Sequence, residues 1–100
     1  MTARAQTEGI HSRITADGPL TIYTVGELKA AFLDAIPLDG AVELDLSAVS
    51  EIDTAGLQLV LASRKRASEN GSTLRITKAS RAVDELLELF ALGASLVGEA

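Results

Sequence analysis

The sequence has no cysteine and no tryptophan, and it has a single histidine. Without cysteine the chain can form neither a disulfide framework nor a thiolate nucleophile, and one histidine cannot supply a site built from several histidines. His11 stands among ordinary surface-type residues in an expected strand, so we interpret it as structural or solvent-exposed. These absences exclude most metal and nucleophile chemistry, and they leave the redox compartment open.

Long apolar runs and positive charge are also scarce. Residues 1–8 are small and polar and lack the apolar region of a signal peptide, and no run approaches the about 20 residues of a membrane helix. We therefore expect a cytoplasmic protein that does not insert directly into a membrane. The net charge of −5 disfavours nucleic-acid binding. The one basic run, Arg64-Lys65-Arg66, points around a helix and predicts a solvated face.

What is present indicates one compact domain. The chain has 100 residues, of which 47% are hydrophobic and 23% charged, a balance typical of a single globular core. We expect a flexible lead-in over residues 1–8 and one domain over residues 9–97.

The first half of the chain predicts a hairpin and a helix. Strands are expected at Ile10–Thr15 and at Leu20–Tyr23, because the residues between them, Ala16-Asp-Gly-Pro19, have turn chemistry. Thr24 and Glu27 have the spacing of a capping box. A helix should follow and end at Pro37. We interpret Tyr23 and Phe32 as core or edge residues.

The second half alternates strands and helices. Val42, Leu44 and Leu46 alternate with polar residues, which predicts a central strand. A helix is expected over about Thr54–Asn70, with Gly71 in the left-handed position after it and a strand at Leu74–Ile76. Ser80 should cap a last helix that buries the stripe Val83, Leu86, Leu87 and Phe90. That helix should end at Gly93, with frayed residues beyond Leu96.

These elements predict an α/β fold with the order ββαβαβα. Each of the last three strands is followed by a helix, and such crossovers connect parallel neighbours, so the sheet should be mixed and mainly parallel. Each helix has one apolar stripe and the strands alternate in polarity, so the helices should pack on one face of the sheet.

The turn between the central strand and the second helix carries the most informative motif. Asp53 and Thr54 stand where a helix start needs side-chain oxygens, so capping alone explains both residues. Gly56 in the first turn is costly for a helix, which indicates either close approach of a partner backbone or simple tolerance near the helix end. The carboxylates Asp45, Glu51 and Asp53 are close in sequence, but Asp45 and Glu51 are expected on opposite sides of a turn. We interpret these carboxylates as solubility and capping groups, with no metal or other cofactor.

The run Leu44-Asp-Leu-Ser47, followed by Ile52-Asp-Thr-Ala-Gly-Leu57 and the helix ending near Asn70-Gly71, resembles a STAS domain, the module of bacterial anti-sigma-factor antagonists. The resemblance extends from about Ile10 to Leu92. It implies that Thr54 is the phosphoacceptor, and it implies partner contacts at Asp53, Thr54, Ala55, Gly56 and Leu57. Ala55 departs from the serine that the sporulation-type members have there, so only one hydroxyl is present.

The resemblance further implies a non-enzymatic, cytoplasmic module for signal transduction and transcription regulation. Its partners would be an anti-sigma factor or serine/threonine kinase of the histidine-kinase-ATPase type and, in addition, a phosphatase. Two alternatives stay open. One is the small STAS subunit of a phospholipid-transport ABC system, whose Thr54 region would contact the ATPase without phosphorylation. The other is a STAS module of a chemotaxis or two-component signalling complex.

Overall fold

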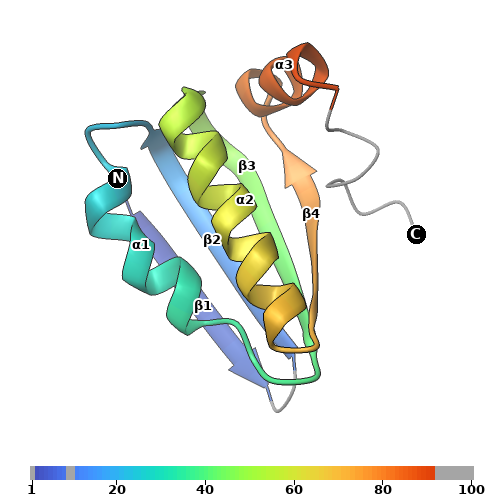
Figure 1. Ribbon diagram of the computed structural model, residues 1–100. Helices are drawn as coiled ribbons and strands as arrows, with labels where there is room; N and C mark the ends of the chain where they lie inside the picture. Colours follow the sequence, from blue (N-terminus) through green and yellow to red (C-terminus); the bar gives the residue numbers. More distant parts are fainter. Residues whose placement is uncertain (1, 9–10, 92–100) are drawn as a thin grey trace.

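The computed structural model describes residues 2–8 and 11–91 (Figure 1). These residues form four strands and three helices, which follow one another along the chain as β1 (Thr2–Glu8), β2 (His11–Leu20), α1 (Val25–Asp34), β3 (Ala41–Ile52), α2 (Thr54–Glu69), β4 (Thr73–Ala79) and α3 (Arg81–Leu89).

The four strands form one mixed sheet in the order β1-β2-β3-β4. β2, β3 and β4 are parallel and each is followed by a helix, whereas β1 pairs antiparallel with β2. The predicted α/β class, with three parallel strands alternating with three helices, is confirmed. Because the carboxyl ends of the parallel strands lie at one edge of the sheet, the segments that follow β2 and β3 are brought side by side there.

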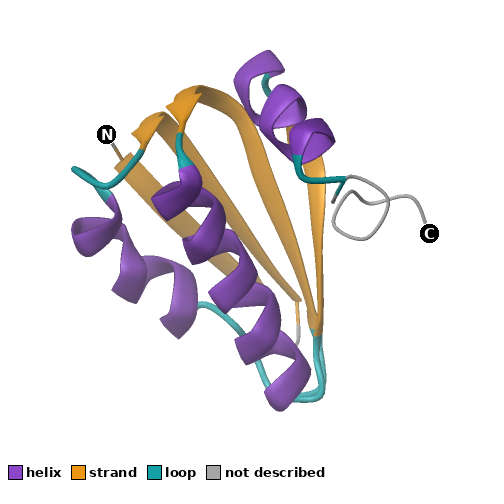
Figure 2. Ribbon diagram, turned by 45° about the horizontal axis from the view of Figure 1, so that its top comes forward, coloured by secondary structure: helices purple, strands orange, loops and turns teal. Residues whose placement is uncertain are grey.

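The core lies between one face of the sheet and the helices. On β3 the side chains of Val42, Leu44 and Leu46 are buried while Glu43 is exposed, as the alternation of a strand with one wet face requires. Helices α1 and α2 lie side by side over the buried face (Figures 1 and 2). Helix α3 packs against β3 and β4 at the end of the sheet. Phe32 of α1 is fully buried, as predicted for a core residue.

The predicted hairpin in the first half of the chain is wrong. Residues 16–19 lie inside β2 and do not form a turn. Gly18 has a positive φ of 84°, and the pairing of β2 with β3 shifts register between Thr15 and Asp17 and again between Gly18 and Pro19. The turn-type residues thus make irregularities within one long strand. Ile10, the expected start of the first strand, lies outside the described residues.

The first strand of the sheet lies within residues 1–8, for which a flexible lead-in was expected. Residues Thr2–Glu8 form β1 and pair with β2 from Asp17 back to His11. A short edge strand is held by backbone hydrogen bonds to its one neighbour, so it needs no strong apolar alternation of its own. That is why the composition of residues 1–8 did not reveal it.

Helix α1 begins at Val25 without the predicted capping box. The hydroxyl of Thr24 forms no cap hydrogen bond. It accepts from the backbone N–H of Thr21 at 2.9 Å and donates to the carbonyl of Pro19 at 3.0 Å. Thr24 therefore stabilises the turn between β2 and α1. The start of α1 is held by backbone hydrogen bonds and not by a side-chain cap.

Helix α2 ends as the sequence predicted. Gly71 has a φ of 74°. The N–H of Ser72 donates to the carbonyl of Ala67 at 2.7 Å, and the N–H of Gly71 donates to the carbonyl of Ser68 at 3.1 Å. This pair of bonds is a Schellman motif. Ser80 caps α3, as predicted, by accepting from the N–H of Val83 at 3.3 Å. The predicted end of α3 at Gly93 is wrong, because α3 ends at Leu89 and Ala91 already has a positive φ of 55°. Phe90, predicted to lie in the buried stripe of this helix, follows the helix and is 45% exposed. The predicted fraying beyond Leu96 lies outside the described residues.

The loop after α1 is joined to the loop after α2 by a seam of hydrogen bonds at the amino ends of β3 and β4. The N–H of Asp39 donates to the carbonyl of Asn70 at 2.9 Å, and the N–H of Gly40 donates to the hydroxyl of Ser72 at 2.9 Å. The N–H of Thr73 donates to the carbonyl of Gly40 at 3.0 Å. These hydrogen bonds hold the two loops together at this end of the molecule.

Candidate functional site at the turn between β3 and α2

The opposite end of the sheet carries the turn between β3 and α2, which contains Asp53 and Thr54. Asp53 is the N-cap of α2 and Thr54 is the first residue of the helix. Thr54 therefore lies beside the N-cap, at the predicted helix start. One carboxylate oxygen of Asp53 accepts from the N–H of Gly56 at 3.0 Å. The other accepts from the N–H of Ile22, in the turn between β2 and α1, at 3.0 Å. We call these two bonds the Asp53 clamp, because they join the two neighbouring turns.

The clamp favours the charged form of Asp53. Hydrogen bonds from the N–H of Ile22 and then from the N–H of Gly56 lower the pKa of the carboxyl group below its ordinary value of 3.8. A second carboxyl group, Asp45, also has a lowered pKa, chiefly because the hydroxyl of Ser47 donates to it at 2.6 Å.

The lowered pKa of Asp53 predicts that the protein loses stability in acid. The folded state holds the proton less tightly than the unfolded chain, so the carboxylate stabilises the fold above an unfolded pKa of about 4. That contribution is lost as the pH falls through the lower pKa of the folded state. Urea unfolding between about pH 6 and pH 2 should therefore show a fall in the free energy of unfolding at the acid end.

The matched variants are Asp53→Asn and Asp45→Asn. Asparagine is also a good N-cap, so Asp53→Asn should fold and should lose only the acid dependence that Asp53 supplies. Asp45→Asn should remove a separate part of that dependence. An acid limb that is unchanged in Asp53→Asn would contradict the role of the clamp.

Thr54 presents its hydroxyl to solvent. The residue is exposed, and among the described residues the hydroxyl has no hydrogen-bond partner, because Asp53 caps the helix. Ala55 beside it is half-buried. Capping therefore does not explain the threonine, which is the alternative that the sequence alone had left in place.

Gly56 and Leu57 face inward. A Cβ atom added to Gly56 would lie 2.1 Å from the backbone oxygen of Leu20 and 2.9 Å from a side-chain carbon of Ile52. The close approach that the sequence suggested at this glycine is made by the end of β2 of the same chain. Leu57 is 4% exposed and belongs to the core. Of the five residues predicted to contact a partner, Asp53, Thr54 and Ala55 are the ones with accessible surface.

Two residues next to this turn were missed. Ile22 and Tyr23 lie in the turn between β2 and α1, and their side chains are 62% and 89% exposed. The interpretation of Tyr23 as a core or edge residue is wrong, because β2 ends at Leu20 and the chain turns at Thr21. The sequence signal for this turn is a threonine five residues after Pro19. Its hydroxyl donates to the carbonyls of Pro19 and Thr21, and these bonds require the chain to turn between Pro19 and Thr24.

Asp45 and Glu51, two of the three carboxylates that are close in sequence, both lie on β3. The turn predicted between Asp45 and Glu51 is absent, because β3 continues to Ile52 with Val49 buried. Six residues of extended chain place Asp45 and Glu51 about 20 Å apart. Within residues 2–8 and 11–91, no group of three or more metal-ligating side chains is present. The predicted helical face of Arg64, Lys65 and Arg66 is exposed.

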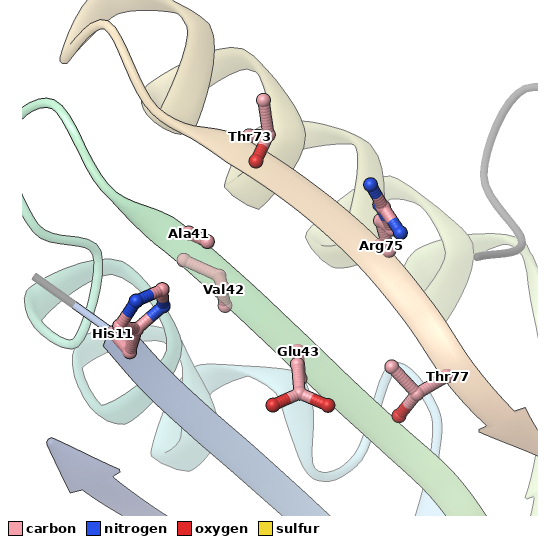
Figure 3. Close-up of a pocket in the computed structure, with 7 residues that line it drawn as sticks. All are labelled: His11, Ala41, Val42, Glu43, Thr73, Arg75 and Thr77. Atoms are coloured by element: carbon pink, nitrogen blue, oxygen red, sulfur yellow. The ribbon is translucent and has the colours of Figure 1, made fainter. Parts of the chain in front are cut away.

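His11 lies at the other end of the molecule. It opens β2 and pairs with Ala41, the first residue of β3, whereas Thr54 follows the last residue of β3. His11 is exposed on the polar face of the sheet, where a shallow hollow of about 260 Å³ is also lined by Glu43 and Arg75 (Figure 3). Glu43 is bridged to Arg13 at 3.7 Å. Thr54 thus has no histidine beside it to act as a base.

No helix in the described part of the chain has both the length and the apolar character needed to cross a membrane.

The chain matches a family model described as "Mlab, STAS domain" over residues 3–98. No curated protein matches it in sequence. Among solved structures it is similar to an anti-sigma factor antagonist from Mycobacterium paratuberculosis, with a TM-score of 0.79, 19% identity, and coverage of 95% of this chain and 81% of the other.

Two further structures show the same likeness. A STAS domain protein from Planctomyces limnophilus gives a TM-score of 0.80 at 19% identity and covers 95% of this chain and 86% of its own. The phosphorylated form of SpoIIAA, a Bacillus cell fate determinant, gives 0.70 at 15% identity, with coverage of 99% and 92%. At these identities the likeness establishes the fold.

Proposed function

The chain belongs to the STAS domain family, of the type described as Mlab, and we propose that it is a non-enzymatic, cytoplasmic regulatory module similar to an anti-sigma factor antagonist. In this proposal a partner serine/threonine kinase switches the module by phosphorylating Thr54. The observation that carries this proposal is the Thr54 hydroxyl, which is exposed and free at the start of α2 while the neighbouring Asp53 does the capping.

The reaction itself belongs to the kinase. The γ-phosphoryl group of ATP is transferred to the Thr54 oxygen, ADP leaves, and the hydroxyl proton passes to a base on the kinase, since this chain has no histidine near Thr54. A phosphatase would reverse the modification by hydrolysis. The partner is an anti-sigma factor or kinase of the histidine-kinase-ATPase type, as the resemblance implied.

A phosphate on Thr54 changes the charge of the turn far more than its shape. It adds a charge of about −1.5 to −2 at the start of a helix, where free N–H groups partly stabilise it. Asp53 and Glu51 are close in sequence and oppose it. The Asp53 clamp and the closely packed Gly56 hold the backbone in place. A partner with apolar or acidic groups over the turn is then repelled while the domain stays folded.

We predict that Thr54 is the functional phosphoacceptor. Incubation with the cognate kinase and ATP, followed by mass spectrometry, should give one phosphate on Thr54 and none in the Thr54→Val variant. Ser50 is exposed and serves as an internal comparison, whereas Ser63 is fully buried and out of reach. Phosphate confined to Ser47, Ser50 or Ser63 would remove Thr54 from the proposal.

One observation favours a second candidate. The family model that matches is described as Mlab, whereas the anti-sigma factor antagonist from Mycobacterium paratuberculosis is similar in structure at only 19% identity. The chain would then be the small STAS subunit of a phospholipid-transport ABC system and would contact an ATPase through the same turn without phosphorylation. Co-purification of an ATPase with unphosphorylated protein, together with no phosphate on Thr54 in cells, would select this candidate.

A further inference from the structure

A shallow apolar groove runs between α1 and α2 and begins beside the Thr54 turn. Its volume is about 230 Å³, and its lining includes Val25, Gly26 and Lys29 from α1 and Ala55, Leu59 and Ala62 from α2. The two helices lie side by side and start at the same end of the sheet (Figure 1), so the mouth of the groove is next to the site proposed above.

The size and pattern of the groove fit side chains of a helix. Small-molecule sites enclose about 300 to 1,000 Å³, more than this open groove offers. The lining residues on α2 recur at the spacing 55, 58, 59 and 62, which is one stripe along two helical turns. Nothing lies within 4 Å of a Cβ atom added to Gly26. A helix laid in such a groove inserts side chains at matching intervals.

Two exposed apolar side chains lie in the turn that leads into α1. Ile22 and Tyr23 stand just before the N-cap Thr24, and they are 62% and 89% exposed. The Asp53 clamp holds the N–H of Ile22 at 3.0 Å and so fixes this turn beside Thr54. Large apolar side chains this exposed, a few residues before the groove residues Val25 and Gly26, indicate an interaction surface.

The charge of the groove selects the chemistry of its occupant. Lys29 is the one charged side chain in the lining, and Arg66 stands four residues after Ala62 on the same stripe of α2 and is also exposed. Charged groups that meet in an interface are arranged with opposite sign. The groove therefore favours a carboxylate on the partner.

We propose that the groove receives an amphipathic helix of the partner whose apolar side chains enter between α1 and α2 and whose acidic side chain pairs with Lys29. The inference rests on the proposed function for the identity of the site, and it adds the partner's chemistry. It also gives the switch a physical basis: a dianion on Thr54 at the mouth of the groove repels an acidic helix and must be desolvated beneath apolar side chains.

Two model peptides test the proposal on the isolated ¹⁵N-labelled chain. The acidic peptide has 18 residues, with Leu at i, i+3, i+4 and i+7 and Glu at the flanking positions, and the basic peptide has Lys in place of each Glu. In heteronuclear NMR titrations the acidic peptide should shift the amide signals of Tyr23, Gly26, Ala55 and Ala62. It should bind at least tenfold more tightly than the basic peptide.

The variants are chosen to keep the fold. Gly26→Leu fills the groove from a position with free space and should weaken binding of the acidic peptide at least tenfold. Ala30→Leu places the same leucine side chain on α1 outside the groove lining and is its control. Lys29→Glu should reverse the preference between the two peptides, whereas Lys65→Glu, which removes the same charge elsewhere, should not.

Several outcomes would overturn the proposal. These are shifts confined to the polar face of the sheet, the absence of shifts at millimolar peptide, equal binding of the two peptides, or a Gly26→Leu variant that binds normally. Self-association of the free chain through these residues, seen by sedimentation, would assign the groove to a second copy instead. None of these measurements uses a kinase or a phosphate, so their result is independent of whether Thr54 is phosphorylated.

Discussion

Gly56→Ala is expected to lower the free energy of unfolding by about 3 kcal/mol, at the upper end of the range for overpacked interiors. The added Cβ atom would lie 2.1 Å from the carbonyl oxygen of Leu20. That oxygen is backbone, and it also accepts from the N–H of Asp53 at 3.4 Å, so it cannot move aside without opening the junction of β2 with the Thr54 turn. Urea or thermal unfolding followed by circular dichroism measures the loss.

Gly26→Ala is the matched control, because it makes the same change in the first turn of the neighbouring helix. A Cβ atom there meets nothing within 4 Å. Alanine is the better helix former by up to about 1 kcal/mol, so this variant should be as stable as the parent or slightly more so. Equal losses in the two variants would show that the cost is one of glycine replacement in general and not of the contact with Leu20.

Thr54→Glu should weaken binding of the cognate kinase or anti-sigma factor at least tenfold, which corresponds to about 1.4 kcal/mol, while Thr54→Ala should bind like the parent. The carboxylate must lose its hydration against the partner, whereas in the free protein it lies at the positive start of α2 and leaves the fold intact. Isothermal titration calorimetry of the three proteins against the same partner measures the difference.

Thr54→Gln separates charge from size, since it matches Glu in shape and is neutral. It should bind more tightly than Thr54→Glu. Thermal unfolding should place Thr54→Ala within about 0.5 kcal/mol of the parent, because Asp53 and not Thr54 accepts the capping bond. A loss of about 1 kcal/mol with unchanged affinity in all variants would make Thr54 a structural residue and would end its role as a switch.

The order of the elements that follow Pro37 was predictable, because several of their features obey local rules. Leu44 and Leu46 alternate with polar neighbours, Gly71 takes the left-handed conformation that ends a helix, and Ser80 caps the next one. Each of these signals depends on residues within a few positions of one another. The βα alternation then follows, because a helix between two strands requires them to be parallel.

The errors in the first half arose where tertiary pairing overrides local preference. The sequence Asp17-Gly-Pro19 has the chemistry of a turn, but its pairing with β3 continues through two register shifts. The end of β3 was missed for a similar reason: Ser47 and Ala48 both face solvent, which breaks the alternation before Val49 is buried again. Strand irregularities of this kind are set by the neighbouring strand and leave little trace in the sequence.

The candidate site was likewise predictable where the signals are local and not where they depend on contacts distant in sequence. Asp53, Thr54 and their helix start were predictable from capping preferences and from the family motif. The inward role of Gly56 and the second bond of Asp53 depend on Leu20 and Ile22, which lie more than 30 residues earlier in the chain. A single sequence has no local signal for contacts at that separation.

The Asp53 clamp has a consequence for the kinetics of association. The turn that carries Ile22 and Tyr23 is fixed to the start of α2 during folding, so its backbone has little conformational entropy left to lose when a partner arrives. A partner therefore meets a preorganised surface, and its arrival requires little rearrangement of this chain. Changes in affinity caused by one added charge are then carried largely by the dissociation rate, and the lifetime of the complex becomes the quantity that the state of Thr54 sets.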